Sequence, residues 1–530
     1  MPERPRARFC DASTPPLLTP HGDVPEGFGG EAALGSVIEL AASSSSTGHA
    51  IDAAAVVQEG EPKLMRGVWA PAARTWTWSD VRERLRGHVF ADVHLTDGYH
   101  YAPADSRASL HGLLGQRHST AQVRVRNLSA EVVLDALLKA EQMQSAHPGV
   151  SADAPDAQRR AFWRRRWAAE SPPSSPTRRQ RSGSSRARAN DANEGGGEVL
   201  VGGTDGGNGS HLIDLLQGRR LLHFDTIPFA LEPALRPQEP LYVSTYDSRQ
   251  RMQYMWLSSP GMRTHTHFDS DRNMFVQLIG RKRFVLWPPN QTARLCMYPR
   301  LHPLWHKSRA DFEAPETTRL RPCREYGHSQ ALGVSVQAGD VLYVPPYWWH
   351  TVETLTPSLS LSTLSRWPQL YNHLNAIYRH TYAFDALAHY PSRVYALRAY
   401  LTRLALRAKL PQLFDSLAAQ YEGLEHLFRA GGRGAAPGGG CSLDARGTPL
   451  SRSVLGRVDF DVTMIWNEHL AHLPPDVRAV ALPEYVEEVT AEALGAAEVL
   501  PFWRECFGPS SPPFFLTHPG SEEHIRLWRQ

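Results

Sequence analysis

The chain has 530 residues, a hydrophobic fraction of 42% and a formal charge of +3. It is longer than one ordinary domain, and the hydrophobic fraction is sufficient for a sizeable core. The 41 prolines and 40 glycines indicate irregular segments between the folded parts. Because the charge is small when averaged over the chain, it does not indicate nucleic-acid binding, and any electrostatic argument must be local.

Five cysteines lie far apart in the sequence and none form a CxxC pair, which argues against a zinc finger and against a disulfide framework. The first residues are basic, but no apolar run follows them, so we expect no secretory signal. No stretch approaches the length needed to cross a bilayer. We therefore predict a protein of the cytosol, the nucleus or both, without membrane association.

The N-terminal part begins with 50 residues rich in Pro, Gly, Ala and Ser, which we expect to be mostly disordered. EPKLMRGVW, residues 61–69, predicts a strand and a turn. Residues 75–87 predict a short helix with Ser79 as its N-cap. Strands at 89–94 and 122–125 then precede a helix that Ser129 opens.

Residues 147–209 differ abruptly in composition, with RRAFWRRRWAA, a Ser/Arg-rich run and a Gly-rich end. They predict a basic low-complexity insertion. One interpretation is a solvated tether without a partner. The other is a nuclear-localisation or RNA-contacting segment, which Trp163 and Trp167 among the arginines favour.

Short strand-like runs follow up to about Trp367, separated by Gly, Pro or Asp: LYVSTY, QYMWLSS, MFVQLIG, RFVLWP, DVLYVPP and LSLSTL. Many short strands at this spacing are typical of a barrel or sandwich. After Trp367 the pattern becomes helical, is interrupted by AGGRGAAPGGG, and ends in a further helix. We therefore predict a mainly β fold with flanking helices.

A metal site is indicated by THTHFDSD, residues 264–271. Residues two apart on a strand point to the same face, so His267 and Asp269 can point together into the interior. GDVLYVPPYWWH supplies a third group, His350, at the end of an apolar strand. Two histidines and one carboxylate leave three metal positions open, as in non-haem iron(II) oxygenases. Periodicity alone leaves the register open, because His265 and Asp271 share the same alternating face.

Residues 264–367 resemble the JmjC/cupin-like oxygenases, in particular the hydroxylase branch that includes the hypoxia-factor asparaginyl hydroxylase and the tRNA wybutosine hydroxylase. The similarity lies in the HxD motif, in NMFVQLIGRKRFVLWPP and in GDVLYVPPYWWH, which stand in the family's order. The resemblance implies a double-stranded β-helix (jelly-roll, cupin) fold. It also implies that His267, Asp269 and His350 bind Fe(II), and that 2-oxoglutarate and dioxygen (O2) are cosubstrates.

Lys282 follows the Ile279–Gly280 turn and should point inward with Phe284 and Leu286, where a buried lysine needs an anion. The alternative is a hairpin-tip lysine in solvent, as we expect of Arg281 and Arg283. The resemblance implies that Lys282 binds the far carboxylate of 2-oxoglutarate. It further implies that Thr264 hydrogen-bonds the same carboxylate and that Asn273 lies near the site.

Two positions depart from the family pattern. GRRLLHF, residues 218–224, lacks a tyrosine that contacts the cosubstrate in the asparaginyl hydroxylase, and His223 is a substitute worth testing. Near Ser365 that relative has an asparagine close to the metal, and the shorter serine would leave room for a water.

The function that the resemblance implies is hydroxylation of a protein side chain, with 2-oxoglutarate decarboxylated to succinate. The alternatives are hydroxylation of a modified tRNA base and a catalytically silent scaffold. We expect a protein substrate, with tRNA as the second choice, and a homodimer formed through the C-terminal helices. The predicted division is a disordered segment at 1–50, the first part of the cupin-like domain at 51–146, the basic insertion at 147–209, the catalytic part at 210–368, a helical region at 369–428, a Gly-rich linker at 429–452 and a C-terminal helical segment at 453–530.

Overall fold

A computed structural model describes residues 60–67, 76–96, 122–145, 220–231, 252–310, 329–425 and 452–508, with isolated gaps inside these ranges. It also describes residue 56 and short strands at 35–40, 100–101 and 198–201. LYVSTY, most of the basic insertion and the Gly-rich linker lie outside the described residues. So does most of the N-terminal segment, although it contributes the strands Gly35–Ser36 and Ile38–Leu40 where we had expected disorder.

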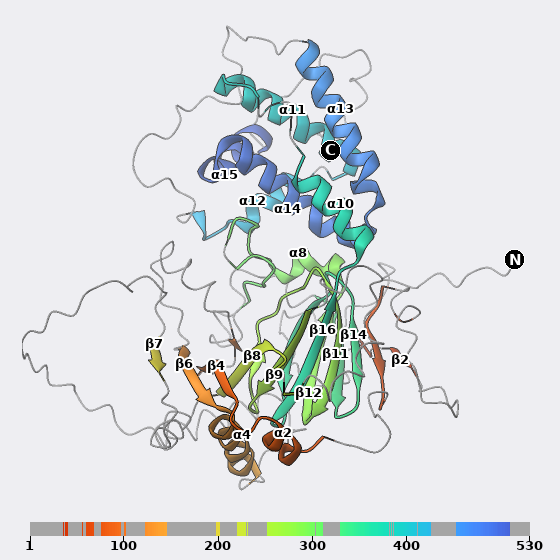
Figure 1. Ribbon diagram of the computed structural model, residues 1–530. Helices are drawn as coiled ribbons and strands as arrows, with labels where there is room; N and C mark the ends of the chain where they lie inside the picture. Colours follow the sequence, from red (N-terminus) through yellow and green to blue (C-terminus); the bar gives the residue numbers. More distant parts are fainter. Residues whose placement is uncertain are drawn as a thin grey trace, which may run out of the picture.

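Two β-sheets form the lower half of the molecule in Figure 1, and most of their strand pairs are antiparallel. The larger sheet has the order β2 (Ile38–Leu40), β3 (Lys63–Met65), β14 (Val341–Val344), β11 (Arg272–Ile279), β16 (Ser358–Ser365), β9 (Met252–Ser258), β8 (Arg220–Thr226), β4 (Val89–Thr96), β6 (Gln122–Ser129) and β7 (Glu198–Val201). The smaller sheet has the order β1 (Gly35–Ser36), β13 (Leu332–Gln337), β12 (Arg281–Trp287), β15 (Trp349–Thr354), β10 (Arg263–Thr264) and β5 (His100–Tyr101).

The sheets face each other across an apolar interior, because alternate residues of each strand point inward. Phe275 of β11 meets Phe284 of β12 there, with ring centroids 4.8 Å apart. The same core cluster contains Leu286 of β12 and Leu342 of β14. The predicted fold class is confirmed: two large sheets of mainly antiparallel strands, with helices around them.

The outer face of the larger sheet is covered by two helices, α2 (Trp78–Arg84) and α4 (Ala130–Ser145). The N-cap of α2 is Thr77, not Ser79 as predicted. Thr77 and Asp80 form a capping box, in which the Thr77 hydroxyl accepts from the Asp80 amide and the Asp80 carboxylate accepts from the Thr77 amide. The helix therefore begins one residue before Ser79. Helix α4 starts directly after Ser129, as the sequence predicted.

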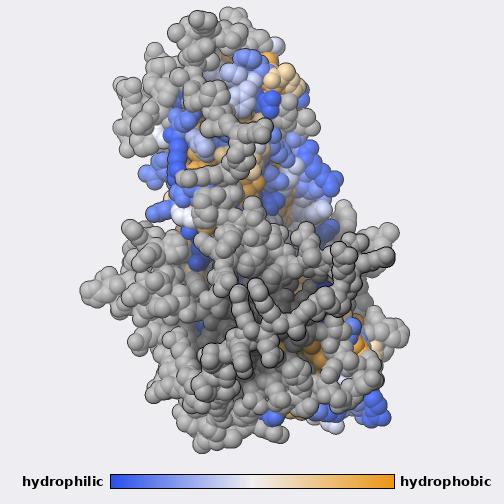
Figure 2. Space-filling view, turned by 90° about the vertical axis from the view of Figure 1, so that its left-hand side faces the viewer, coloured by the Kyte–Doolittle hydropathy of each residue, from blue (hydrophilic) through white to orange (hydrophobic). Residues whose placement is uncertain are grey.

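The helical region lies over one end of the sheets (Figure 1) and consists of α10 (Pro368–Tyr378), α11 (Tyr390–Ala408), α12 (Leu413–Gln420), α13 (Arg452–Glu468), the 3-10 turn η7 (Leu470–His472), α14 (Pro475–Leu494) and α15 (Val499–Phe507). Its core is continuous with the outer face of the smaller sheet, which contributes Val285, Trp287 and Trp349. In Figure 2 the visible part of these helices is mainly hydrophilic, with hydrophobic side chains between them. The helices thus bury their apolar faces against one another and against the sheet.

The Gly339–Asp340 turn before β14 is held by a buried carboxylate. Asp340 accepts hydrogen bonds from the amides of Gly67 (3.1 Å) and Gln337 (3.0 Å). It also pairs with Arg66 at 2.8 Å. Because Arg66 and Gly67 directly follow β3, this turn fixes the N-terminal part of the domain to the strand that leads to His350.

The cysteines and the length of the helices bear on two expectations from the sequence. Cys296 and Cys506 are both disulfide-bonded, although the spacing of the cysteines gave no reason to expect a disulfide. Cys506 is buried in the helical core, and Cys296 packs against the same core. Among the helices that the structure describes, none is long and apolar enough to cross a membrane.

Candidate metal centre

His267, Asp269 and His350 come together next to Phe268 and Trp349, which belong to the core shared with the helical region. Their ligand atoms all lie within 4.8 Å of one another. The segment containing His267 pairs with β15 through two backbone hydrogen bonds, from the His267 amide to the His350 carbonyl (3.0 Å) and from the His350 amide to the His267 carbonyl (2.7 Å). Two segments far apart in sequence therefore present their imidazoles side by side, with ring centroids 4.3 Å apart.

Both imidazoles are oriented by backbone carbonyls. The Nδ1 atom of His267 lies 2.6 Å from the His265 carbonyl oxygen, and that of His350 lies 3.0 Å from the Trp348 carbonyl oxygen. Since a carbonyl can only accept, each Nδ1 carries a proton, and in the neutral form of each ring the lone pair is on Nε2. Nε2 of His350 lies 3.9 Å from the Asp269 carboxylate. Burial and the neighbouring His350 lower the pKa of His267 to about 4, so this ring is neutral at pH 7.

The other two acidic and imidazole groups of the motif lie differently. His265 places its Nδ1 3.2 Å from the Thr266 carbonyl, and Asp271, whose pKa is raised by burial, is not part of the cluster. Among the described residues, His267, Asp269 and His350 are the only group of three such side chains whose ligand atoms already lie within 4.8 Å of one another. The structure therefore favours one of the registers that periodicity left open.

Phe268, between the two ligand candidates, anchors the loop to the core beneath it. Its amide donates to the His306 carbonyl (3.2 Å), and its ring packs edge-on to Trp349, with centroids 4.9 Å apart. The next carbonyl, that of Asp269, accepts from the Tyr347 amide at 2.8 Å. Because Phe268 points into the core, its two neighbours point to the opposite side.

Lys282 lies on the inner face of the smaller sheet, on the same side of β12 as Phe284 and Leu286. It is 3% exposed, and its ammonium lies 5.5 Å from the centroid of the Phe275 ring. In the part of the chain that the structure describes, no carboxylate forms an ion pair with it. Burial lowers the pKa of Lys282 to about 7. An anion that binds beside this buried ammonium would strongly stabilise its charged form.

Hydroxyl groups surround the strands next to Lys282. Thr354 is its direct partner on β15, and the Thr354 hydroxyl lies 2.9 Å from that of Ser258 on β9. On β16, the Ser360 hydroxyl donates to the Gln277 side chain at 3.0 Å. These residues were not predicted from the sequence, although the alternating serines of LSLSTLS indicate one small, polar face of β16.

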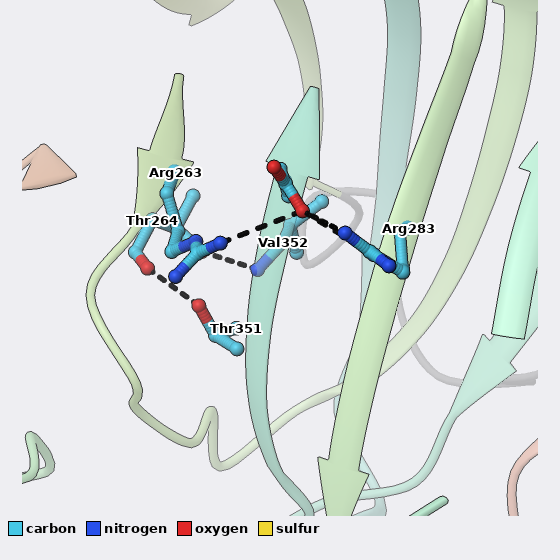
Figure 3. Close-up of polar contacts among 6 residues, drawn as sticks. Arg263, Thr264, Arg283, Thr351 and Val352 are labelled. Carbon is cyan, nitrogen blue, oxygen red and sulfur yellow. Dashed lines mark hydrogen bonds and ion pairs between the residues drawn. The ribbon is translucent and has the colours of Figure 1, made fainter. Parts of the chain in front are cut away.

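Thr264 and Asn273 occupy defined positions at the same end of the molecule. The Thr264 hydroxyl accepts from the Val352 amide at 2.9 Å, and the Thr264 carbonyl accepts from the Thr351 hydroxyl at 2.8 Å (Figure 3). Among the described residues no acceptor takes the Thr264 hydroxyl proton, so it can be donated to a bound group. Asn273 is 7% exposed, and its side-chain oxygen has no hydrogen-bond partner within the described part of the chain.

The opposite face of β15 carries charges that are fully paired. Glu353 lies between Arg283 (2.7 Å) and Arg263 (3.5 Å), which come from the two strands beside it (Figure 3). These ion pairs link β10 and β12 to β15, the strand that carries His350. They also place Arg283 on the side away from Lys282, as alternation requires.

His223 does not lie at the site. Its ring is 2% exposed and packs on Phe90, and its Nδ1 lies 2.7 Å from the Asp92 carbonyl. Phe90 belongs to the core on the outer face of the larger sheet, so His223 points away from Lys282. The suggestion that His223 replaces the missing tyrosine is therefore wrong. Ser365 is buried and is the β-partner of Arg272 at the start of β11.

Comparison with protein families matches residues 50–369 to the model of the cupin-like domain. This match covers more than half of the chain. The chain belongs to the cupin-like family. The predicted resemblance is thereby confirmed, and the match includes the three clustered side chains and Lys282.

Known relatives align over a shorter part. HSPB1-associated protein 1 homolog of Danio rerio is 36% identical over 104 residues, which are 19% of this chain and 23% of the relative. JmjC domain-containing protein D of Dictyostelium discoideum is 31% identical over 108 residues, 20% and 23% of the two chains. Lysine-specific demethylase JMJ31 of Arabidopsis thaliana is 30% identical over 99 residues, 19% and 18% of the two chains. Each alignment spans less than a quarter of the relative's length.

Proposed function

We propose that the chain is an Fe(II)- and 2-oxoglutarate-dependent dioxygenase that hydroxylates a protein side chain. The observation that carries this proposal is the placement of the His267, Asp269 and His350 cluster in the same fold interior as a buried lysine without a carboxylate partner among the described residues. The donor set fits iron(II), because two imidazoles and one carboxylate leave three coordination positions open.

His267, Asp269 and His350 would hold the iron, and the carbonyls that accept from both Nδ1 atoms would keep each Nε2 directed at it. Lys282 would bind the far carboxylate of 2-oxoglutarate by a charge-assisted hydrogen bond, and the free hydroxyl proton of Thr264 would provide a second donor. Asn273 supplies a buried amide whose oxygen has no hydrogen-bond partner among the described residues.

Iron(II), 2-oxoglutarate and dioxygen together supply oxidation of a C–H bond, with one oxygen atom going to the substrate and one to succinate, and with release of carbon dioxide. The chain's own contribution is to orient the cosubstrate, to exclude water and to position the substrate. The apolar interior around Phe275, Phe284 and Leu286 serves the exclusion of water.

The test is to incubate the full chain with Fe(II), 2-oxoglutarate, dioxygen and a protein extract, with Asp269→Asn as the control. Hydroxylation predicts that succinate formation rises with the extract, and that a protein gains the mass of one oxygen atom only with the wild type. Formaldehyde release without a lasting gain of oxygen would instead identify a demethylase, the activity for which the Arabidopsis thaliana relative is named. Stimulation by RNA, and not by protein, would identify the tRNA alternative.

Two related expectations remain proposals. We propose a homodimer formed through the C-terminal helices, which sedimentation of the full chain would test. We also propose that the protein acts in the cytosol or nucleus.

A further inference from the structure

Three histidines meet in the helical region, away from the candidate iron site. His373 lies in α10, His469 directly follows α13, and His472 ends the turn η7. The Nδ1 atoms of His373 and His469 are 3.3 Å apart. The ring of His472 lies parallel to that of His373, with an interplanar angle of 10° and centroids 5.4 Å apart.

We propose that His373, His469 and His472 bind one divalent transition-metal ion of the zinc type. Zinc–nitrogen bonds of about 2.05 Å at tetrahedral angles separate two ligand nitrogens by about 3.3 Å. That is the separation of the two Nδ1 atoms. Imidazole ligands favour zinc, copper, nickel or cobalt over magnesium and calcium.

The backbone holds the first two ligands in place. Leu374, next to His373, and Leu470, next to His469, are both buried in the helical core. The His469 amide donates to the Ile465 carbonyl at 3.2 Å, which continues the hydrogen bonding of α13. Ligands on helices fixed by packing give a more precise site than ligands on free loops.

The third ligand is free to complete the site. In this structure His472 stacks on His373 and its nitrogens do not yet lie within ligand distance of both other rings. His472 is exposed, so its ring must rotate toward the two Nδ1 atoms when a metal binds. Its amide donates to the His469 carbonyl (3.1 Å), which keeps the two residues on one turn. Glu468, exposed and adjacent to His469, offers a carboxylate for the fourth position, which water can also fill.

The protonation of the cluster agrees with this function. Burial, together with His373 and the other histidines nearby, lowers the pKa of His469, so it is neutral at pH 7. Neutral imidazole is the form that binds a metal. Without a metal, the close Nδ1 pair is a hydrogen bond in which one ring donates to the other.

The test is calorimetric titration of the full, untagged chain with Zn2+ after removal of metals by a chelator. The variants are the pair His373→Ala with His469→Ala, and His472→Ala alone, whose exposed position makes misfolding an improbable cause. The matched control is His389→Ala, an exposed histidine of the same region whose side chain, among the described contacts, bonds only Ser392. The variant His267→Ala separates this site from the candidate iron site.

We expect the double variant to bind one Zn2+ fewer per chain than the wild type, and His472→Ala to bind it at least about tenfold more weakly. His389→Ala should match the wild type, and His267→Ala should keep the site. Zn2+ should also raise the thermal unfolding midpoint of the wild type more than that of the double variant. Equal zinc stoichiometry and affinity in the wild type and the double variant would overturn the proposal, and so would an equal loss in His389→Ala.

Discussion

Lys282 places a positive charge in an apolar interior, and its energetic consequence can be measured without any substrate. Burial lowers its pKa in the folded chain to about 7, whereas the unfolded chain keeps the ordinary lysine value of 10.5. Between these two pH values the unfolded state binds more protons, so the free energy of unfolding rises with pH. Below pH 7 both states are protonated, and the destabilisation is at its full size.

Lys282→Met is therefore expected to stabilise the protein when no cosubstrate is bound, by on the order of a few kcal/mol at pH 7. The gain should shrink as the pH approaches 10.5, because the wild type recovers stability over that window. Urea denaturation of both proteins at several pH values measures the difference. Denaturation midpoints that stay parallel across the window would show that Lys282 is solvated in the folded state.

How far the sequence predicts the site depends on the residue. The inward position of Lys282 followed from its alternation with Phe284 and Leu286. The direction of His223 did not, because a strand with apolar residues on both faces has no sequence signal for which face is inside. The register within THTHFDSD also required the pairing of His267 with His350, which are 83 positions apart and meet only in the folded chain.

The turn between β11 and β12 leaves no space for a side chain at Gly280. Gly280 has φ +80° between the two strands, and a Cβ atom there would lie 2.1 Å from the Pro357 carbonyl oxygen. Gly87 has a similar φ of +74° but no atom within 4 Å of such a Cβ. The two glycines therefore share the backbone requirement and differ only in the space around them.

Gly280→Ala is expected to cost more than about 4 kcal/mol of stability, because the alanine combines an unfavourable φ with a clash against backbone. Gly87→Ala should cost only about 1 to 2 kcal/mol, the penalty of the left-handed conformation alone. Chemical denaturation of both variants measures these costs. Similar losses in the two would contradict the steric account of the hairpin.

Element boundaries were predicted less well than element types. The short helix over residues 78–84 was expected, but its cap is Thr77 because Asp80 completes a capping box that Ser79 cannot form with the same geometry. Many strands of the two sheets, among them β9, β11, β12 and β16, followed from short apolar runs between turn residues, whereas β8, β13 and β15 were not predicted. The order of the strands in the sheets did not follow from the sequence, because β8 and β9 lie next to strands far away in sequence.

At the scale of the whole molecule, the helical region and the outer face of the smaller sheet share one hydrophobic core. Phe268, Trp287 and Trp349 pack with residues of α10 to α15 in a single cluster. The family match ends at residue 369, where almost all of these helices are still to come. Sequence composition suggested a boundary near 368, but it could not show that the packing continues across it.

A chain that ends at residue 369 is therefore expected to expose Trp287 and Trp349 and to lose fixed tertiary packing. It should bind a hydrophobic dye such as ANS and lose near-ultraviolet circular dichroism. A chain that ends at residue 508 keeps every described helix and is the matched control. If the shorter chain unfolds as cooperatively as the control, the sheets are an independent domain.

The central claim is that His267, Asp269 and His350 bind iron(II) and that 2-oxoglutarate binds beside it. Anaerobic titration of the purified chain with Fe(II) and 2-oxoglutarate, followed by visible absorption, tests this most directly. We expect the weak band of iron-bound 2-oxoglutarate in the wild type and no band in His267→Ala, with both proteins folded by circular dichroism. No band in the folded wild type, or an equal band in the variant, would contradict the account and favour a cupin-fold scaffold.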